Sequence, residues 1–84
     1  MVLSNQKRWF FGMNEEFSVI KIKGKKAYLM AYENGFKWTT NVNDSIWFDY
    51  EYKAEQFADG YFKNFKNYEI IPLEYNIKKD KITV

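Results

Sequence analysis

The side chains of this chain that could do chemistry are its serines, lysines and carboxylates, because the sequence contains neither histidine nor cysteine. Their absence excludes the usual catalytic triads and dyads, and also zinc sites built from thiolate and imidazole ligands. A serine–lysine pair could in principle form from Ser4, Ser18 or Ser45, but no motif supports it. The glycines are scattered and make no phosphate-binding loop. We therefore predict a protein that is not an enzyme and that uses neither a cofactor nor a metal.

Composition limits the remaining classes of function. At 84 residues the chain is long enough for one small domain, residues 1–84, and 21% of its residues are aromatic. With no disulfide available, those large side chains are expected to supply most of the stabilising burial. The net charge of +2 is too weak to imply a polyanionic partner, and Arg8 is the only arginine that could grip guanine or phosphate in bidentate fashion. No apolar run is long enough to span a membrane, so we expect a cytoplasmic protein without a membrane partner.

The elements that must position these side chains include an amphipathic helix, predicted over residues 49–65. Its apolar residues recur at helical spacing and form one broad stripe: Tyr50, Ala54, Phe57, Ala58, Tyr61, Phe62 and Phe65. Asp49 is expected to cap the first turn, where negative charge is favourable. A helix of this length cannot bury its stripe alone, so the rest of the chain must provide a surface for it.

Two turn signals predict a three-stranded meander before the helix. Gly24-Lys25, with glycine in the first central position, is typical of a type II′ hairpin, and Asn34-Gly35 is typical of a type I′ hairpin. They separate β-prone runs at residues 17–23, 26–33 and 36–40. If each dipeptide is a whole loop, Lys21 faces Tyr28, Val19 faces Met30, and Glu33 faces Phe36.

These registers divide the meander between two faces, since side chains alternate along a strand. The first face is expected to receive the helix and carries Ile20, Ile22, Ala27, Leu29, Ala31, Phe36 and Trp38. The second face combines aromatic, methionine and lysine side chains, and it contains the predicted binding residues Phe17, Lys21, Tyr28, Met30, Tyr32 and Lys37. A contiguous apolar patch of this kind on a small protein indicates an interaction surface.

Three explanations compete for the second face. The chain could cover it itself, with Trp9-Phe10-Phe11 or with the C-terminal segment. A protein partner or a second copy of the chain could bind there, because tyrosine and methionine are enriched at interface centres. Single-stranded nucleic acid could stack its bases on the rings, with lysines following the phosphates, although the weak net charge and the scarcity of arginine count against this.

The C-terminal part of the chain supplies the closing strand. Residues 68–75 read as a strand, and Pro72 places it at a sheet edge or interrupts it. Residues 78–81 read as a turn or tail and residues 82–84 as a possible short last strand. Residues 1–14, with the aromatic run Trp9-Phe10-Phe11, read as either a short strand or an arm that packs over another surface. The predicted fold class is α+β, with two layers: an antiparallel β-β-β-α-β sheet and one amphipathic helix packed on one face.

Part of this pattern resembles small accessory proteins of bacteriophages and mobile elements. The matching positions lie between Ile20 and Tyr75: residues 37–40 (KWTT), residues 46–49 (IWFD), Ala54, Phe57 and Ala58, and residues 68–71 (YEII). The resemblance implies a host-takeover or anti-defence protein, such as an anti-CRISPR inhibitor, that acts in the host cytoplasm by binding a host protein or defence component. It carries over no functional residue.

A second resemblance is to DNA-binding domains with a three-stranded sheet and one helix, such as those of plant AP2 factors and some phage-type integrases. Those domains read the major groove with the sheet face opposite the helix, using several arginines. The corresponding face of this chain contains none. Nucleic-acid binding through that face is therefore the alternative hypothesis, and binding of a protein is the first.

Overall fold

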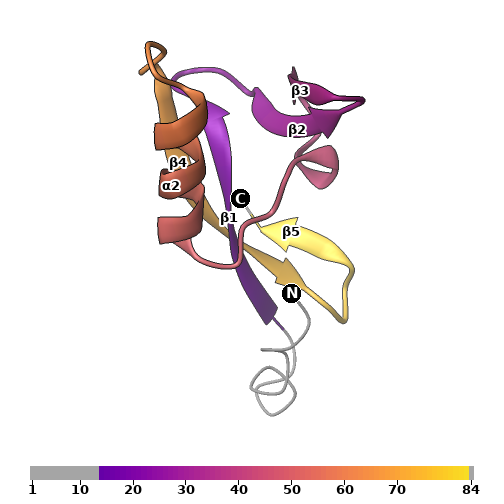
Figure 1. Cartoon of the computed structure of the whole chain (residues 1–84). Coiled ribbons are helices and arrows are strands. Elements are labelled where there is room, and N and C mark those ends of the chain that lie inside the picture. Colours follow the sequence, from indigo (N-terminus) through magenta and orange to yellow (C-terminus); the bar gives the residue numbers. More distant parts are fainter. Residues whose placement is uncertain (1–13, 84) are drawn as a thin grey trace.

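The computed structural model describes residues 14–83 and shows a five-stranded antiparallel sheet with one helix packed against it (Figure 1). In chain order the elements are β1 (Asn14–Ile22), β2 (Tyr28–Tyr32), β3 (Gly35–Thr39), the short 3-10 helix η1 (Val42–Asp44), α2 (Glu51–Tyr61), β4 (Tyr68–Asn76) and β5 (Lys81–Thr83). The order across the sheet is β3-β2-β1-β4-β5. The predicted α+β class is confirmed, with β5 as the short last strand. The predictions for residues 1–13 and for Val84 lie outside the described residues.

The centre of the sheet is the pair β1–β4, which is in register from Asn14 opposite Asn76 to Ile22 opposite Tyr68. Pro72 faces Ser18, whose backbone N–H and carbonyl both bond to Phe48 on the other side of β1 (2.9 and 2.8 Å). Ser18 and Pro72 therefore form a pair that exchanges no hydrogen bonds, and the missing N–H of Pro72 points away from β1. Within the described residues β5 pairs only with the last part of β4, beyond Pro72. The prediction that Pro72 places its strand at an edge or interrupts it is therefore wrong for the strand as a whole, because β4 runs unbroken between β1 and β5. Pro72 is tolerated because it lies in the part of β4 that β5 does not reach.

The first turn differs from its prediction. Gly24, at φ 74°, occupies the second central position of a turn that Lys25 closes by donating its N–H to the Ile22 carbonyl (3.2 Å). Lys21 lies opposite Tyr28 as predicted, but this is the only registered pair between β1 and β2. The predicted pairing of Val19 with Met30 does not form.

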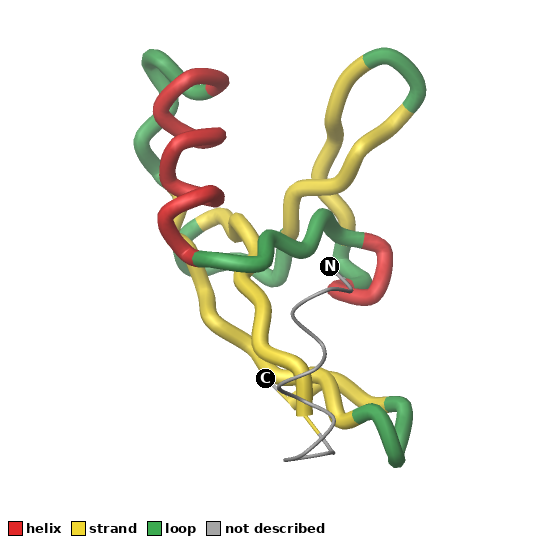
Figure 2. Tube along the Cα trace, turned by 60° about the horizontal axis from the view of Figure 1, so that its bottom comes forward, coloured by secondary structure: helices red, strands yellow, loops and turns green. Residues whose placement is uncertain are grey.

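The reason is a competing segment at residues 46–48. The Ile46 N–H donates to the Leu29 carbonyl (2.9 Å), and Phe48 pairs with Ser18. These residues use the backbone groups that a longer β1–β2 ladder would need. The β2–β3 hairpin consequently leaves the sheet after one pair and extends away from it, at the upper right of Figure 2.

The second turn is displaced by one residue. Tyr32 pairs with Gly35, so the loop is Glu33-Asn34, with Glu33 at φ 51°, and the predicted Asn34-Gly35 loop is wrong. Phe36 lies opposite Ala31, two residues from its predicted partner Glu33. A shift of two residues leaves every side chain on its predicted face, because the alternation of a strand has a period of two.

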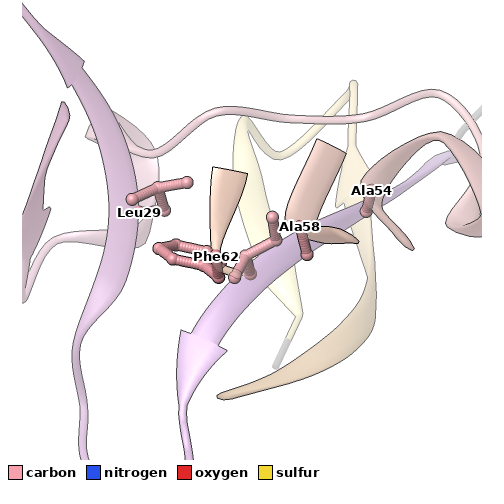
Figure 3. Packing of buried hydrophobic residues seen from close by; sticks show 5 residues of the cluster. Leu29, Ala54, Ala58 and Phe62 are labelled. Atoms are coloured by element: carbon pink, nitrogen blue, oxygen red, sulfur yellow. The ribbon is translucent and has the colours of Figure 1, made fainter. Parts of the chain in front are cut away.

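The first core lies between the sheet and α2. Ala54 and Ala58 are fully buried, and they pack with Phe62 against Ile20 and Leu29. Figure 3 shows Ala54, Ala58 and Phe62 following one another along the helix, with Leu29 beside Phe62. Because alanine projects only a methyl group, the helix backbone can approach the sheet closely. The central part of the predicted stripe thus faces the sheet as expected, whereas Tyr50, Tyr61 and Phe65 are exposed.

The helix itself is shorter than the predicted span of residues 49–65. Its N-cap is Tyr50, which makes no side-chain capping bond, so the prediction that Asp49 caps the helix is wrong. Asp49 instead lies 3.9 Å from the Lys53 ammonium, one turn along the helix. Phe62 ends the helix and donates its N–H to the Ala58 carbonyl (2.8 Å). No helix within residues 14–83 has the length and apolar character needed to cross a membrane.

A second core lies on the opposite face of the central strands. Its buried members are Phe17, Val19, Tyr28 and Leu73. Partly buried side chains from the β3–α2 connection and from the β4–β5 hairpin pack against them: Val42, Trp47, Ile71, Tyr75 and Ile82. Both faces of the β1–β4 pair are therefore covered by apolar side chains.

Candidate binding surfaces

The structure closes much of the face that was predicted to bind. Phe17 and Tyr28 are each only 5% exposed, so the expectation that they form part of an open patch is wrong. The Phe17 ring stacks on Trp47 with 4.0 Å between centroids, and the Trp47 indole N–H donates to the Val42 carbonyl (3.2 Å). Of the covers considered for this face, the C-terminal segment contributes through Ile82. Among the described residues, Ile71 and Tyr75 of β4 also pack there, and the β3–α2 connection, which the sequence did not predict as a cover, contributes Val42 and Trp47.

Lys21 stays on this face but its charge is paired. Its ammonium donates to the Glu69 carboxylate and to the Ile22 carbonyl, both at 3.2 Å, and it is partly buried. Glu69 lies directly opposite Lys21 across the β1–β4 pair. Because its ammonium is already paired with a carboxylate, Lys21 should attract an anionic ligand less strongly than an unpaired surface lysine would.

The other three predicted residues come together on the β2–β3 hairpin. Met30 lies opposite Lys37, and the Lys37 ammonium lies 4.0 Å from the centroid of the Tyr32 ring. Tyr32 is 47% exposed and Met30 is partly buried. The hairpin thus retains a small exposed remnant of the predicted site, whereas Phe17 and Tyr28 are buried in the second core.

A second exposed surface forms where α2 meets the hairpin, and the sequence did not predict it. The rings of Phe36, Phe57 and Tyr61 contact one another, with centroids 4.9 Å apart for Phe36–Tyr61, 5.1 Å for Phe36–Phe57 and 5.6 Å for Phe57–Tyr61. Tyr61 is 50% exposed, and Ala31, opposite Phe36 in the hairpin, is exposed as well. We call these four residues the helix–hairpin patch.

The helix–hairpin patch exists because the hairpin leaves the sheet early. The pattern placed Phe36, Phe57 and Tyr61 on the side where helix and sheet meet, and that placement is correct. A hairpin paired along its whole length with β1 would lie flatter beneath the helix, and it could cover these rings more completely. Because the hairpin pairs with β1 at one position only, the hairpin ring that contacts Phe57 and Tyr61 of α2 is that of Phe36.

Carboxylates gather at another place, around an open depression of about 550 Å³ between the start of α2 and the central strands. Its exposed acidic lining residues are Glu16, Asp49, Glu51 and Glu74. Within residues 14–83 no three acidic side chains are grouped so that they could hold a metal ion. Exposed carboxylates of this kind give the depression a negative potential, but their positions do not define a nucleophile, an acid or a ligand cage.

Within residues 14–83, the pKa of one side chain, Tyr75, departs clearly from its ordinary value. The Tyr75 hydroxyl donates a hydrogen bond to the Asp80 carboxylate across the β4–β5 turn. This bond, together with partial desolvation and the negative charges of Asp80 and Glu15, raises the pKa of Tyr75 above the usual 10.0. The Asn76 side-chain oxygen also accepts from the Lys79 N–H (2.8 Å), so the raised pKa reports an ordered turn and not a catalytic group.

No protein-family model, curated protein or solved structure matches this chain. The resemblance to phage accessory proteins therefore stays a prediction. The function has to be argued from the surfaces themselves. The helix–hairpin patch joins exposed aromatic area to ring contacts between two separate elements, α2 and the β2–β3 hairpin.

Proposed function

We propose that this protein is a non-enzymatic binding protein that docks onto a bacterial host protein through the helix–hairpin patch. The observation that carries the proposal is the exposure of Tyr61, half of whose surface stays in water although its ring is ordered by Phe36 and Phe57. Ordered aromatic side chains that remain partly exposed are typical of interface centres, since little side-chain entropy is lost when a partner covers them.

Gly60 supports the same surface. It lies one turn after Phe57, on the flank of the helix away from the buried Ala54 and Ala58. A methyl group built at Gly60 would meet no other atom within 4 Å, so packing within the chain does not require glycine there. Glycine in a helix interior costs about 1 kcal/mol relative to alanine. A partner whose backbone approaches beside Phe57 would account for a residue that the fold itself does not need.

The shape of the patch favours a protein over a small ligand. The patch is composed of rings that contact one another, and the depression described above, which a small ligand could enter, lies elsewhere, at the start of α2. Small-molecule sites are concave and bury most of the ligand, whereas protein interfaces accept a flat aromatic centre. By the resemblance to phage accessory proteins, we place the interaction in the host cytoplasm, with a defence component as the partner class and inhibition as the effect.

A matched pair of variants on one helix tests the proposal. Tyr52 is 54% exposed, close to the value for Tyr61, and their separation of nine positions in sequence puts the two side chains about 180° apart around the helix. Tagged wild-type protein, Tyr61→Glu and Tyr52→Glu are each incubated with bacterial lysate, and captured proteins are quantified by mass spectrometry. We expect one host protein to be enriched by wild type and by Tyr52→Glu, and not by Tyr61→Glu.

Two controls give the comparison its meaning. Thermal unfolding must show that both variants remain folded, because Tyr61 also contacts Phe62 (5.0 Å). Sedimentation of the purified chain over a range of concentrations shows whether the partner is a second copy, in which case Tyr61→Glu abolishes the dimer. Equal capture by all three proteins, or equal loss in both variants, would show that the helix–hairpin patch is not the docking surface.

A further inference from the structure

Two loops meet at the end of the molecule where α2 ends, and together they form what we call the lysine tip. Residues 23–27 join β1 to β2, and residues 62–67 join α2 to β4. The Lys23 N–H donates to the Asn67 carbonyl (3.1 Å), and Ile22 lies opposite Tyr68 at the adjacent strand ends. Both loops lie at the top of Figure 1, and these contacts hold them side by side.

Positive charge is concentrated in these loops. They contain five exposed lysines and no acidic residue: Lys23, Lys25, Lys26, Lys63 and Lys66. None of the five forms an ion pair within the part of the chain that the structure describes. The nearest carboxylate along β4, that of Glu69, is already paired with Lys21. Since the whole chain carries only +2, the rest of the molecule is net negative, and the tip is a local cationic site.

An ordered ring lies among these lysines. Phe65 stands between Lys63 and Lys66 in the α2–β4 loop and is 37% exposed. Its ring is 5.5 Å from Phe62, 6.1 Å from Trp38 and 6.4 Å from Tyr68, measured between centroids. Phe65 is thus held against the first core, while part of its side chain remains exposed in the loop that also contains Lys63 and Lys66.

We propose that the lysine tip binds single-stranded nucleic acid, with the lysines on phosphates and a base stacked on Phe65. Proteins that bind single strands without strong sequence preference combine cationic grooves with aromatic rings, because every base has a π-face. A base inside a duplex cannot reach such a ring. The lysine tip also has neither an arginine fork nor a helix or strand that could enter a groove, so duplex reading is disfavoured.

This inference does not rest on the proposed docking at the helix–hairpin patch. The two surfaces are composed of different residues, so either can fail alone. It also differs from the nucleic-acid hypothesis drawn from the sequence, which used the sheet face that the second core now closes.

Fluorescence anisotropy of a labelled thymidine oligonucleotide, with its duplex for comparison, measures the binding at several salt concentrations. We expect the single strand to bind more tightly than the duplex. The slope of log K against log salt for a single strand is about −0.7 per neutralised phosphate, so five lysines set a limit of about −3.5. The double variant Lys25→Glu/Lys26→Glu should flatten that slope by at least about 1.4 and weaken binding at low salt.

The matched control is Lys78→Glu/Lys79→Glu in the β4–β5 turn, which changes the net charge by the same amount at two other exposed lysines. Phe65→Leu keeps an apolar side chain against Trp38 but removes the stacking surface. We expect it to weaken single-strand binding by about 5- to 150-fold, the range for loss of one stacked base, and to leave heparin binding unchanged.

Three results would overturn the proposal. One is the absence of single-strand binding at low salt. Another is an equal loss of binding in the control variant Lys78→Glu/Lys79→Glu, which would show that net charge and not the lysine tip is responsible. The third is Phe65→Leu with unchanged oligonucleotide affinity, which would reduce the tip to a general polyanion or acidic-protein contact. Thermal unfolding of each variant confirms that the comparison is made between folded proteins.

Discussion

Replacement of Phe17 by alanine should unfold or severely destabilise the protein, because the structure places this ring inside the second core and not on an open binding face. Phe17 is 5% exposed and stacks on Trp47 at 4.0 Å. A buried phenylalanine replaced by alanine costs about 3–5 kcal/mol. Domains have about 0.05–0.15 kcal/mol of stability per residue, which for 84 residues is about 4–13 kcal/mol in total. The substitution therefore removes a large fraction of the stability available.

Urea unfolding followed by far-ultraviolet circular dichroism measures the effect, and a milder variant keeps the test quantitative. Phe17→Leu retains most of the apolar area and loses the ring stacking, which is worth about 0.5–1.5 kcal/mol beyond area burial. Combined with Trp47→Leu in a double-mutant cycle, it should show a coupling energy in that same range. Tyr32→Ala, on the exposed hairpin face, is the control and should change stability by less than about 1 kcal/mol.

The reasoning would be refuted by an unfolding free energy for Phe17→Ala within about 0.5 kcal/mol of wild type. That result would mean that residues 42–48 do not cover β1, and the original binding face would then be open. A zero coupling energy between Phe17 and Trp47, with both single variants destabilised, would keep the second core but remove the stacked pair from it.

Two other predictions test the helix surface and the C-terminal turn. Gly60→Ala should raise the free energy of unfolding by about 1 kcal/mol, since the added methyl group meets no atom within 4 Å and alanine is the better helix former; a loss of stability in urea would show a contact that the structure lacks. Because the pKa of Tyr75 is raised, its neutral form stabilises the fold, and this contribution is fully present below its ordinary pKa of 10.0 and is lost as the pH rises through the folded value. Urea midpoints of wild type should therefore fall more steeply than those of Tyr75→Phe above about pH 10, and equal slopes would contradict the bond to Asp80.

The division of side chains between the two faces of the sheet could be predicted from the sequence. Leu29 and Trp38 lie on the helix side, and Met30 and Lys37 lie on the other, as expected. The predicted faces are correct although the predicted position of the second turn is wrong. Moving a two-residue loop by one residue changes each cross-strand partner by two positions, which leaves every side chain on the same face. The apolar spacing of the helix was equally reliable, since Ala54 and Ala58 are the residues that pack on the sheet.

The pairing between distant segments could not be predicted. β1 pairs along its whole length with β4, which lies about fifty residues later in the chain. The sequence of either strand by itself does not indicate which other strand it will pair with. The competition of Phe48 for Ser18 is likewise a contact between segments that local propensity does not describe. Turn preference also failed at the β2–β3 hairpin: Glu33 has a positive φ, which is costly for a residue with a side chain, while Gly35 is placed in a strand.

The candidate surfaces follow from the same competition for backbone groups. The aromatic residues fall into three groups that composition cannot distinguish: rings that close the second core, such as Phe17 and Trp47; rings inside the first core, such as Phe62; and rings left at the surface, such as Tyr61. The hydrogen bonds of residues 46–48 to Ser18 and Leu29 decide between them. They bring Trp47 over the second face, which closes it, and they end the β1–β2 ladder early, which leaves the flank of α2 uncovered. The aromatic side chains of the sheet face are thus buried, while those of the helix–hairpin patch stay exposed. A variant that breaks the Ser18–Phe48 pair should expose the sheet face and cover the patch, so that binding through the first surface increases and binding through the second decreases.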